Sequence, residues 1–284
     1  MKQLKIAGMS LKYLLAIGLL TACNHDEPVT PTQKLVTDVS NQNAKISLLT
    51  RLVKNDQQNI QYVKSGKFLG KVSRVNEAPW SGYYLTYAYD DSSPSGDLWI
   101  HRKMYKSSNN AFIKEERYKV VNGLCVLSED DYGSIHEYKY TPQGYLDEIK
   151  YNYQGNLLQS WKYTYTYSGS GQIYRLNKIE RKKNGKPWIN YNFTYKQIQD
   201  KYPLNNPLNI EDGKVDTYLP FFGNHSDLII ESITDENLET NKSVQTFYTG
   251  HVLNSDGLVI SREKVKYATV SIEIFKYSDN WQGI

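Results

Sequence analysis

Apolar and polar residues alternate along much of this chain, and glycine-containing turns separate the alternating stretches. Between residues 161 and 167 every second residue is Trp or Tyr, and Lys or Thr stands between them. The same period of two recurs over residues 83–89, 189–195 and 270–274. A period of two places successive side chains on opposite faces of a strand, and glycine supplies the positive φ that tight hairpins need. The pattern predicts strands that pair antiparallel with their chain neighbours.

The expected fold is therefore all-β. We predict one long antiparallel meander that forms a curved sheet or a partial barrel, as a single soluble domain over residues 34–284. Residues 40–53 fit a helix and a strand equally well. Residues 202–222 hold three of the nine prolines, which disfavours a strand and indicates an excursion that caps one end of the sheet. The aromatic rows favour a core over a ligand platform.

The N-terminus has the features of an exported protein. Three lysines and no acids precede an apolar run that ends in small residues at position 22, which is the order of a signal peptide. The sequence from Leu20 to Cys23 resembles the bacterial lipobox, and the resemblance implies that Cys23 carries acyl chains. We predict a signal peptide over residues 1–22, a lipidated N-terminus and tether over residues 23–33, and the β-rich domain beyond them.

The charges near Cys23 bear on location. Asp26 and Glu27 follow the cysteine closely, and in the Bacteroidota a similar acidic patch directs lipoproteins to the cell surface. We expect a lipid-anchored protein of the outer membrane, displayed on the cell surface, with the periplasmic face as the alternative. Removing three signal-peptide lysines lowers the formal charge from +4 to +1. Because no basic stripe remains, nucleic acid is not an expected partner.

No stretch of the sequence has the spacing of a known catalytic or metal-binding motif. The five histidines lack zinc-ligand spacing, and the adjacent acids would point to opposite faces of a strand. Lipidation of Cys23 leaves Cys125 without a disulfide partner, and its apolar surroundings in the sequence predict a buried, unreactive thiol. We expect no cofactor and no metal. Enzymatic activity has little positive support and stays open.

A degenerate unit recurs along the chain: a tyrosine, a polar turn with glycine, a leucine and then an aliphatic residue. One copy runs from Tyr140 through Gly144 and Leu146 to Ile149. The unit resembles the tyrosine-aspartate repeats of Rhs-type proteins. The whole chain, including residues 219–226 and 230–234, is similar to a family of Bacteroidota lipoproteins of unknown function with a porin-like fold. That resemblance implies a curved sheet or partial barrel and brings no catalytic residues.

Three aromatic residues at turns are the candidate binding residues. Trp80, Tyr145 and Trp188 lie at turns, where a large apolar side chain is not needed for folding. The leading hypothesis is a non-enzymatic binding or structural module for a glycan or another envelope protein. The first alternative is a periplasm-facing carrier of a lipid or another hydrophobic ligand. The second is a glycoside hydrolase or another envelope enzyme.

Overall fold

The computed structural model describes residues 50–168, 173–202 and 215–283. The chain divides into two compact units, Met1–Thr30 and Pro31–Ile284, and every described residue belongs to the second. The predicted signal peptide, Cys23 and the tether therefore lie outside the described residues.

The described residues form sixteen strands and two short 3-10 turns. The strands are β1 (Arg51–Asn55), β2 (Gln58–Tyr62), β3 (Val72–Asn76), β4 (Tyr83–Asp90), β5 (Leu98–Lys106), β6 (Phe112–Val121), β7 (Leu124–Asp130), β8 (Ser134–Tyr140), β9 (Leu146–Tyr153), β10 (Asn156–Ser168), β11 (Ile173–Lys183), β12 (Lys186–Gln199), β13 (Leu228–Asn237), β14 (Lys242–Leu253), β15 (Val259–Lys266) and β16 (Thr269–Ser278). The 3-10 turns are η1 (Pro79–Ser81) and η4 (Trp281–Gly283). Within the described ranges, no helix is long and apolar enough to cross a membrane.

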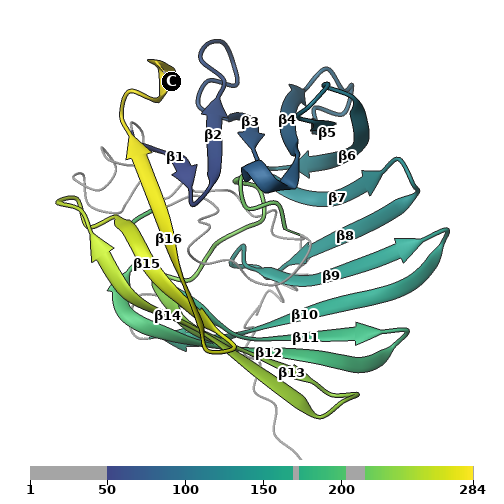
Figure 1. The fold of residues 1–284 in the computed structure, drawn as a ribbon. Helices are drawn as coiled ribbons and strands as arrows, with labels where there is room; N and C mark the ends of the chain where they lie inside the picture. Colours follow the sequence, from purple (N-terminus) through teal and green to yellow (C-terminus); the bar gives the residue numbers. More distant parts are fainter. Residues whose placement is uncertain (1–49, 169–172, 203–214, 284) are drawn as a thin grey trace, which may run out of the picture. The chain divides into compact units, whose positions relative to one another are not determined.

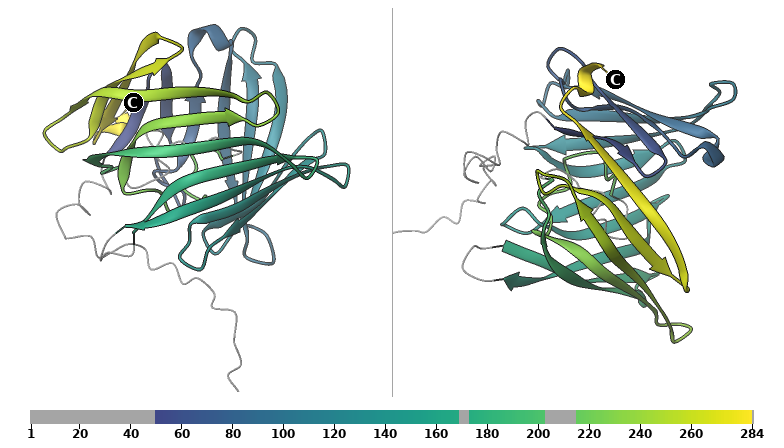
Figure 2. Two further views of the ribbon diagram at one scale, coloured as in Figure 1. Left: turned by 90° about the horizontal axis from the view of Figure 1, so that it is seen from below. Right: turned by 60° about the vertical axis from the view of Figure 1, so that its left-hand side comes forward.

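The strands form one closed barrel (Figures 1 and 2). Each strand pairs antiparallel with the next along the chain, and β1 pairs with β16 through Arg51↔Ser278 and Leu52↔Tyr277. The predicted all-β antiparallel meander is confirmed. The predicted partial barrel is wrong, because the first and last strands complete the ring. This pairing joins the two ends of the domain, so no local pattern in the sequence indicates it.

The alternating rows divide between the two faces of the barrel wall. Trp161 and Tyr163 in β10 are buried, as are Tyr191 and Phe193 in β12. The core placement expected for the aromatic rows is confirmed at these positions. Tyr167, at the far end of the β10 row, is 52% exposed.

The apolar row of β16 faces the opposite way. Val270, Ile272 and Ile274 are 59%, 63% and 45% exposed, whereas Phe275 is buried. Successive residues of a strand point to opposite faces, so placing Phe275 in the core turns the other row outward. The sequence pattern shows the alternation in β16 but not which row enters the core.

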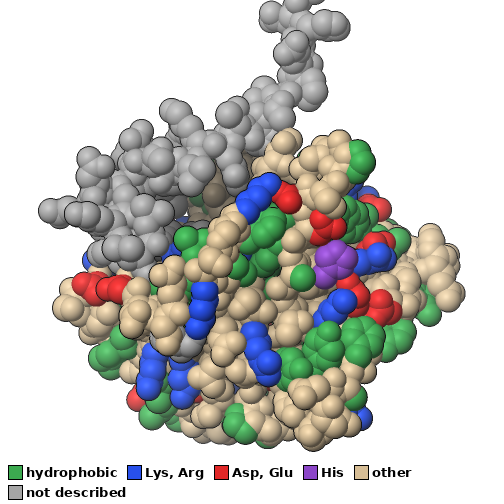
Figure 3. Space-filling view, turned by 90° about the horizontal axis from the view of Figure 1, so that it is seen from above, with side chains coloured by type: hydrophobic (Ala, Val, Ile, Leu, Met, Phe, Trp, Pro, Cys, Tyr) green, Lys and Arg blue, Asp and Glu red, His purple; other side chains and the backbone are tan. Residues whose placement is uncertain are grey.

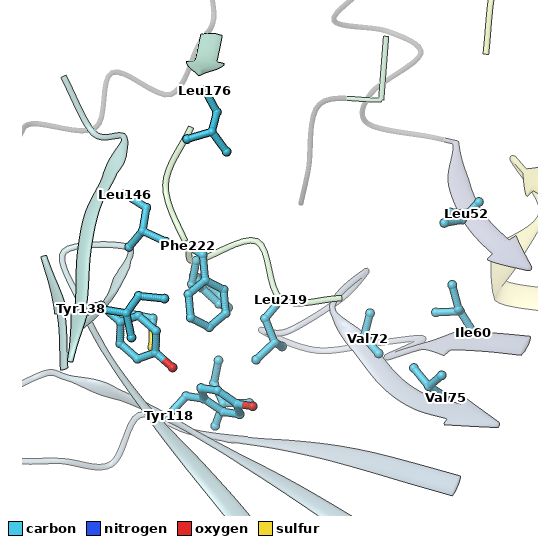
Figure 4. Close-up of a cluster of buried hydrophobic side chains, with 14 of the residues drawn as sticks. Leu52, Ile60, Val72, Val75, Tyr118, Tyr138, Leu146, Leu176, Leu219 and Phe222 are labelled. Carbon is cyan, nitrogen blue, oxygen red and sulfur yellow. The ribbon is translucent and has the colours of Figure 1, made fainter. Parts of the chain in front are cut away.

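Residues 215–227 run through the interior of the barrel. Figure 4 shows Leu219 and Phe222 on this interior segment, lying between side chains of the barrel wall. Both are buried, and the Phe222 ring makes edge contacts with Tyr118 and Tyr138 at centroid distances of 6.0 and 5.2 Å. The described part of the excursion expected over residues 202–222 thus lies within the barrel and does not form a cap over one end.

Polar contacts fix the interior segment to the wall. Asp216 accepts hydrogen bonds from the Tyr87 hydroxyl and from Arg102 Nη1, each at 3.0 Å. The Phe221 carbonyl accepts a hydrogen bond from the Cys125 backbone N–H at 2.6 Å. Because these contacts lie in the interior, where few waters reach, they give the segment one defined position.

Burial of tyrosines in the core predicts loss of stability at alkaline pH. Burial raises the pKa values of Tyr118 and Tyr138 well above the usual value, and burial together with Asp216 does the same for Tyr87. In the unfolded chain these phenols ionise near pH ~10. The stabilisation is complete below that pH and is lost as the pH rises above it. We expect phenolate absorbance of the core tyrosines to appear together with unfolding; ionisation while the circular dichroism stays native would contradict their burial.

Removal of the Phe222 ring tests the packing of the interior segment. Phe222→Ala deletes a buried ring and leaves a cavity, which costs about 3–5 kcal/mol of unfolding free energy. Phe247→Ala is the matched control, because Phe247 is 41% exposed and should change stability by only about 0.5 kcal/mol. Urea denaturation measures both. Equal effects would mean that the interior segment does not pack as described.

Candidate functional site

Three aromatic residues pair side by side on the outer face of the wall. Tyr84 in β4 lies opposite Tyr105 in β5, and Tyr105 lies opposite Phe112 in β6. Leu85 next to Tyr84 and Met104 next to Tyr105 pack in the core, so the aromatic residues belong to the outward-facing positions, where neighbouring side chains leave Tyr84 8% exposed. We call Tyr84, Tyr105, Phe112 and Trp80, described below, the outer aromatic surface.

Stacking and polar contacts hold the rings in place. The Tyr84 and Tyr105 rings are stacked at 5.3 Å with an interplanar angle of 17°, and Phe112 meets the Tyr105 ring edge-on at 5.9 Å. The Arg74 guanidinium lies 3.7 Å from the centroid of Tyr84 on the same face. The Tyr84 hydroxyl donates to the Asn110 side-chain oxygen at 3.0 Å. Each ring therefore has a restricted orientation before any ligand arrives.

Trp80 lies at the same end of the barrel as this row. It is part of η1, in the connection between β3 and β4, and it is 76% exposed. The Gly82 carbonyl of this connection accepts a hydrogen bond from the Ser107 N–H, in the turn that leads to Phe112, at 2.8 Å. Gly82 has φ +70°, which closes the 3-10 turn and directs the chain into β4. Two exposed aromatic side chains thus lie at this end of the barrel: Trp80 in the connection before β4, and Phe112, 53% exposed, at the start of β6.

Tyr145 has a different environment from Trp80. It is buried, its ring packs at 5.2 Å against both Tyr165 and Tyr174, and its hydroxyl accepts a hydrogen bond from the Tyr174 N–H at 3.3 Å. It also forms an isolated bridge with Asn224. Its role in the structure is to hold the interior segment, at Asn224, against the β8–β9 turn.

Trp188 is partly buried near the start of β12. The guanidinium of Arg181 lies 4.3 Å from the centroid of its indole ring, and the ammonium of Lys183 lies 5.1 Å from it. In the ring of sixteen strands, β12 lies eight places from β4. Trp80 and Trp188 are therefore on opposite sides of the barrel, and the structure does not bring the three sequence-predicted residues together.

The sequence pattern did not predict the other members of the outer aromatic surface. The alternation in residues 83–89 identified the row that begins at Tyr83, and Tyr84 belongs to the opposite row. Tyr105 and Phe112 belong to none of the rows identified in the sequence. The available signal was an aromatic residue near the same end of three consecutive strands, which requires the strand register before it can be recognised.

The interior also holds a small polar cluster. The Ser128 hydroxyl lies 3.3 Å from His136 Nδ1, 3.0 Å from the Tyr138 hydroxyl and 3.4 Å from Glu116 Oε1. In a nucleophilic triad the carboxylate orients the histidine, whereas here Glu116 contacts the serine itself. Ser128 is fully buried, so no substrate reaches it. This arrangement suits a structural hydrogen-bond network better than catalysis.

In the described part of the chain, no group of three or more His, Cys, Asp or Glu side chains is placed to hold a metal ion. Cys125 is buried, as expected from its apolar sequence, and burial raises the pKa of its thiol. A thiol with a raised pKa carries little thiolate at neutral pH and is a poor nucleophile.

The chain matches no family model, and no curated protein matches it. Several solved structures are similar, among them the following two. A porin-like protein from Bacteroides uniformis has 14% identity and a TM-score of 0.43, over 80% of this chain and 96% of that one. A porin-like protein from Bacteroides vulgatus has 12% identity and a TM-score of 0.48, over 80% of this chain and 98% of that one. These similarities are too low to carry over an activity or a location.

Proposed function

We propose that this protein is a lipid-anchored binding protein of the cell envelope that holds a glycan on the outer aromatic surface. The observation that carries the proposal is the pair of exposed rings, Trp80 before β4 and Phe112 at the start of β6, at the end of the barrel where Tyr84 and Tyr105 stack. Exposed aromatic rings cost solvation and serve no core, so their grouping indicates a contact surface.

The polar side chains around the rings favour a sugar over a protein partner. Arg74, Asn76 and Asn110 lie beside Tyr84, and Arg74 Nε donates to the Asn76 side-chain oxygen at 2.7 Å. A sugar ring presents an apolar face that can stack on an aromatic ring, and hydroxyls that pair with amide and guanidinium groups. A surface of flat rings bordered by such groups fits both parts of a sugar.

The charge on the outside of the wall supports a barrel that stands in water beside the membrane. Oppositely charged side chains pair across neighbouring strands, as in Lys139–Glu148 at 3.3 Å and Arg117–Glu129 at 2.9 Å. Figure 3 shows basic and acidic side chains mixed with apolar ones on the face it presents. A basic residue on the lipid face of a membrane barrel costs about 2–4 kcal/mol near the midplane. An anchor at Cys23 gives such a barrel its attachment without insertion.

The alternative of a lipid carrier has less support. An acyl chain would need a continuous apolar space inside the barrel, and Leu219 and Phe222 of the interior segment occupy its centre. The enzyme alternative lacks converging catalytic groups that a substrate could reach among the described residues.

Trp80→Ala tests the glycan surface. We expect the variant to lose about 30-fold in affinity for a glycan that the wild type selects from an array, because truncation of a central aromatic contact costs about 2 kcal/mol. The thermal unfolding temperature should not change, since the Trp80 side chain is exposed. Isothermal titration with the full-length protein in a neutral detergent measures the affinity.

The matched control for Trp80 is Tyr132→Ala. Tyr132 is another exposed aromatic residue, 63% accessible, in the turn between β7 and β8, so its loss should leave glycan affinity unchanged. If the wild type selects no glycan, or if both variants lose affinity equally, the outer aromatic surface is not a glycan site.

Cys23→Ser tests the anchor. A serine hydroxyl at position 23 cannot accept the thioether-linked diacylglycerol, so we expect the protein to leave the membrane fraction and to lose incorporation of labelled palmitate. Cys125→Ala, which removes the other cysteine, should keep both properties. Continued membrane attachment of the Cys23→Ser protein would show that the anchor lies elsewhere.

A further inference from the structure

A cavity opens inside the barrel at the end opposite to Trp80. It encloses about 90 Å³ and lies between β1, β2, the connection that leads into β3, and the interior segment. Lys71 stands just before β3, whereas Trp80 follows the end of β3. The cavity and the outer aromatic surface are therefore separate sites.

The wall of the cavity combines two cations with apolar side chains. Arg51 and Lys71 supply the positive charges, and Leu52, Ile60 and Val72 supply buried aliphatic surface. The volume accommodates several water molecules, or an organic molecule of a few carbon atoms. A full acyl chain requires more room than this.

The position of Arg51 is set by the backbone around it. Its Nε donates to the Gly70 carbonyl at 3.4 Å, and its Nη1 donates to the Thr50 carbonyl at 3.2 Å. A Cβ on Gly70 would lie 3.0 Å from Arg51 Nη2, and Gly70 has φ +77°. Glycine at position 70 therefore lets the guanidinium lie close against the connection next to Lys71.

Lys71 is a half-buried cation with no carboxylate beside it. Its ammonium lies 4.8 Å from the centroid of the Phe221 ring, and no described residue forms an ion pair with it. Burial, with a smaller contribution from Arg51, lowers the pKa of Lys71. A half-buried charge that faces a like charge is unfavourable unless an anion joins it.

The tyrosine hydroxyls of the cavity are already engaged in holding the wall together. Tyr62 donates to the Leu52 carbonyl at 2.7 Å, and the Tyr202 hydroxyl accepts from the Leu52 N–H at 3.2 Å. Among the described residues of the cavity, selection of a charged ligand thus falls first to Lys71, which has no carboxylate beside it.

We propose that this cavity binds a small organic carboxylate. Its negative charge lies against Lys71 and Arg51, and its short apolar part packs on Leu52, Ile60 and Val72. This site is independent of the outer aromatic surface and of the glycan proposed there. The carboxylate is either a free short-chain acid or the head of a fatty acid whose remaining chain extends out of the cavity.

Titration of the full-length protein with matched ligands tests the proposal. Hexanoate is the probe, and hexan-1-ol is the neutral ligand of equal chain length. Palmitate tests a fatty acid as the ligand, and inorganic phosphate tests an anion without an apolar part. Hexanoate should bind roughly tenfold or more tightly than hexan-1-ol, because the alcohol lacks the charge that pairs with Lys71. Palmitate binding that competes with hexanoate would support a fatty acid as the source of the carboxylate.

Variants at position 71 assign the effect to the lysine. Lys71→Met should lower hexanoate affinity roughly tenfold or more while leaving hexan-1-ol binding unchanged, and Lys71→Arg should restore the preference. Lys67→Met is the matched control, since Lys67 lies in the same connection with its side chain 73% exposed. Trp80→Ala should bind hexanoate like the wild type, which separates this site from the glycan surface.

The native protein alone can overturn the proposal, whether or not a variant folds. Equal affinity for hexanoate and hexan-1-ol, binding of phosphate without either carboxylate, or absence of binding in every arm each contradict it. A hexanoate preference that survives in a folded Lys71→Met protein contradicts the assigned site.

Discussion

The constraint on which the structure depends is the need to fill a ring of sixteen strands. Side chains from the wall fill a barrel of about eight strands, and a ring of sixteen leaves space for an aqueous channel unless something occupies it. Here residues 215–227 occupy it. Leu219 and Phe222 complete the apolar core, and Asp216 joins the segment to Tyr87 and Arg102. Loss of this segment would expose the inner faces of most strands at once.

A filled interior moves function to the outside and to the ends of the barrel. The outer face over β4–β6 needs no apolar side chains for folding, yet Tyr84, Tyr105 and Phe112 form a continuous row there. The connection that carries Trp80 is joined by a backbone hydrogen bond to the turn that leads to Phe112, so both residues lie at the same end of the barrel. A rigid wall with aromatic residues on its connections is a common design for recognition, because the scaffold limits the entropy lost when a ligand binds.

The sequence predicts the alternation within each strand well and the pairing between distant strands poorly. The period of two correctly places Tyr191 and Phe193 in the core, because alternation is a property of the strand itself. Closure depends on Arg51 pairing with Ser278, which is set by the number, tilt and stagger of all the strands. The row from Val270 to Ile274 shows the same limit, since an alternating strand has two faces and only the assembled barrel decides which one is buried. The sequence identifies Trp80 as an aromatic residue at a turn. It does not identify Lys71 as a candidate, because the cavity around Lys71 is formed by segments that are distant in the sequence.

Two partly buried cations of this barrel differ in the groups that surround them. Arg102 has Glu116 on one side and Asp216 on the other, and its guanidinium also lies 5.6 Å from the Tyr118 ring centroid. The positive charge of Arg102 thus has its counter-ions within the fold. Lys71 has an aromatic ring and a neighbouring arginine, and no carboxylate among the described residues. The anion proposed for the cavity would lie beside Lys71 as Asp216 lies beside Arg102, so that a ligand supplies there the kind of contact that the chain itself supplies to the arginine.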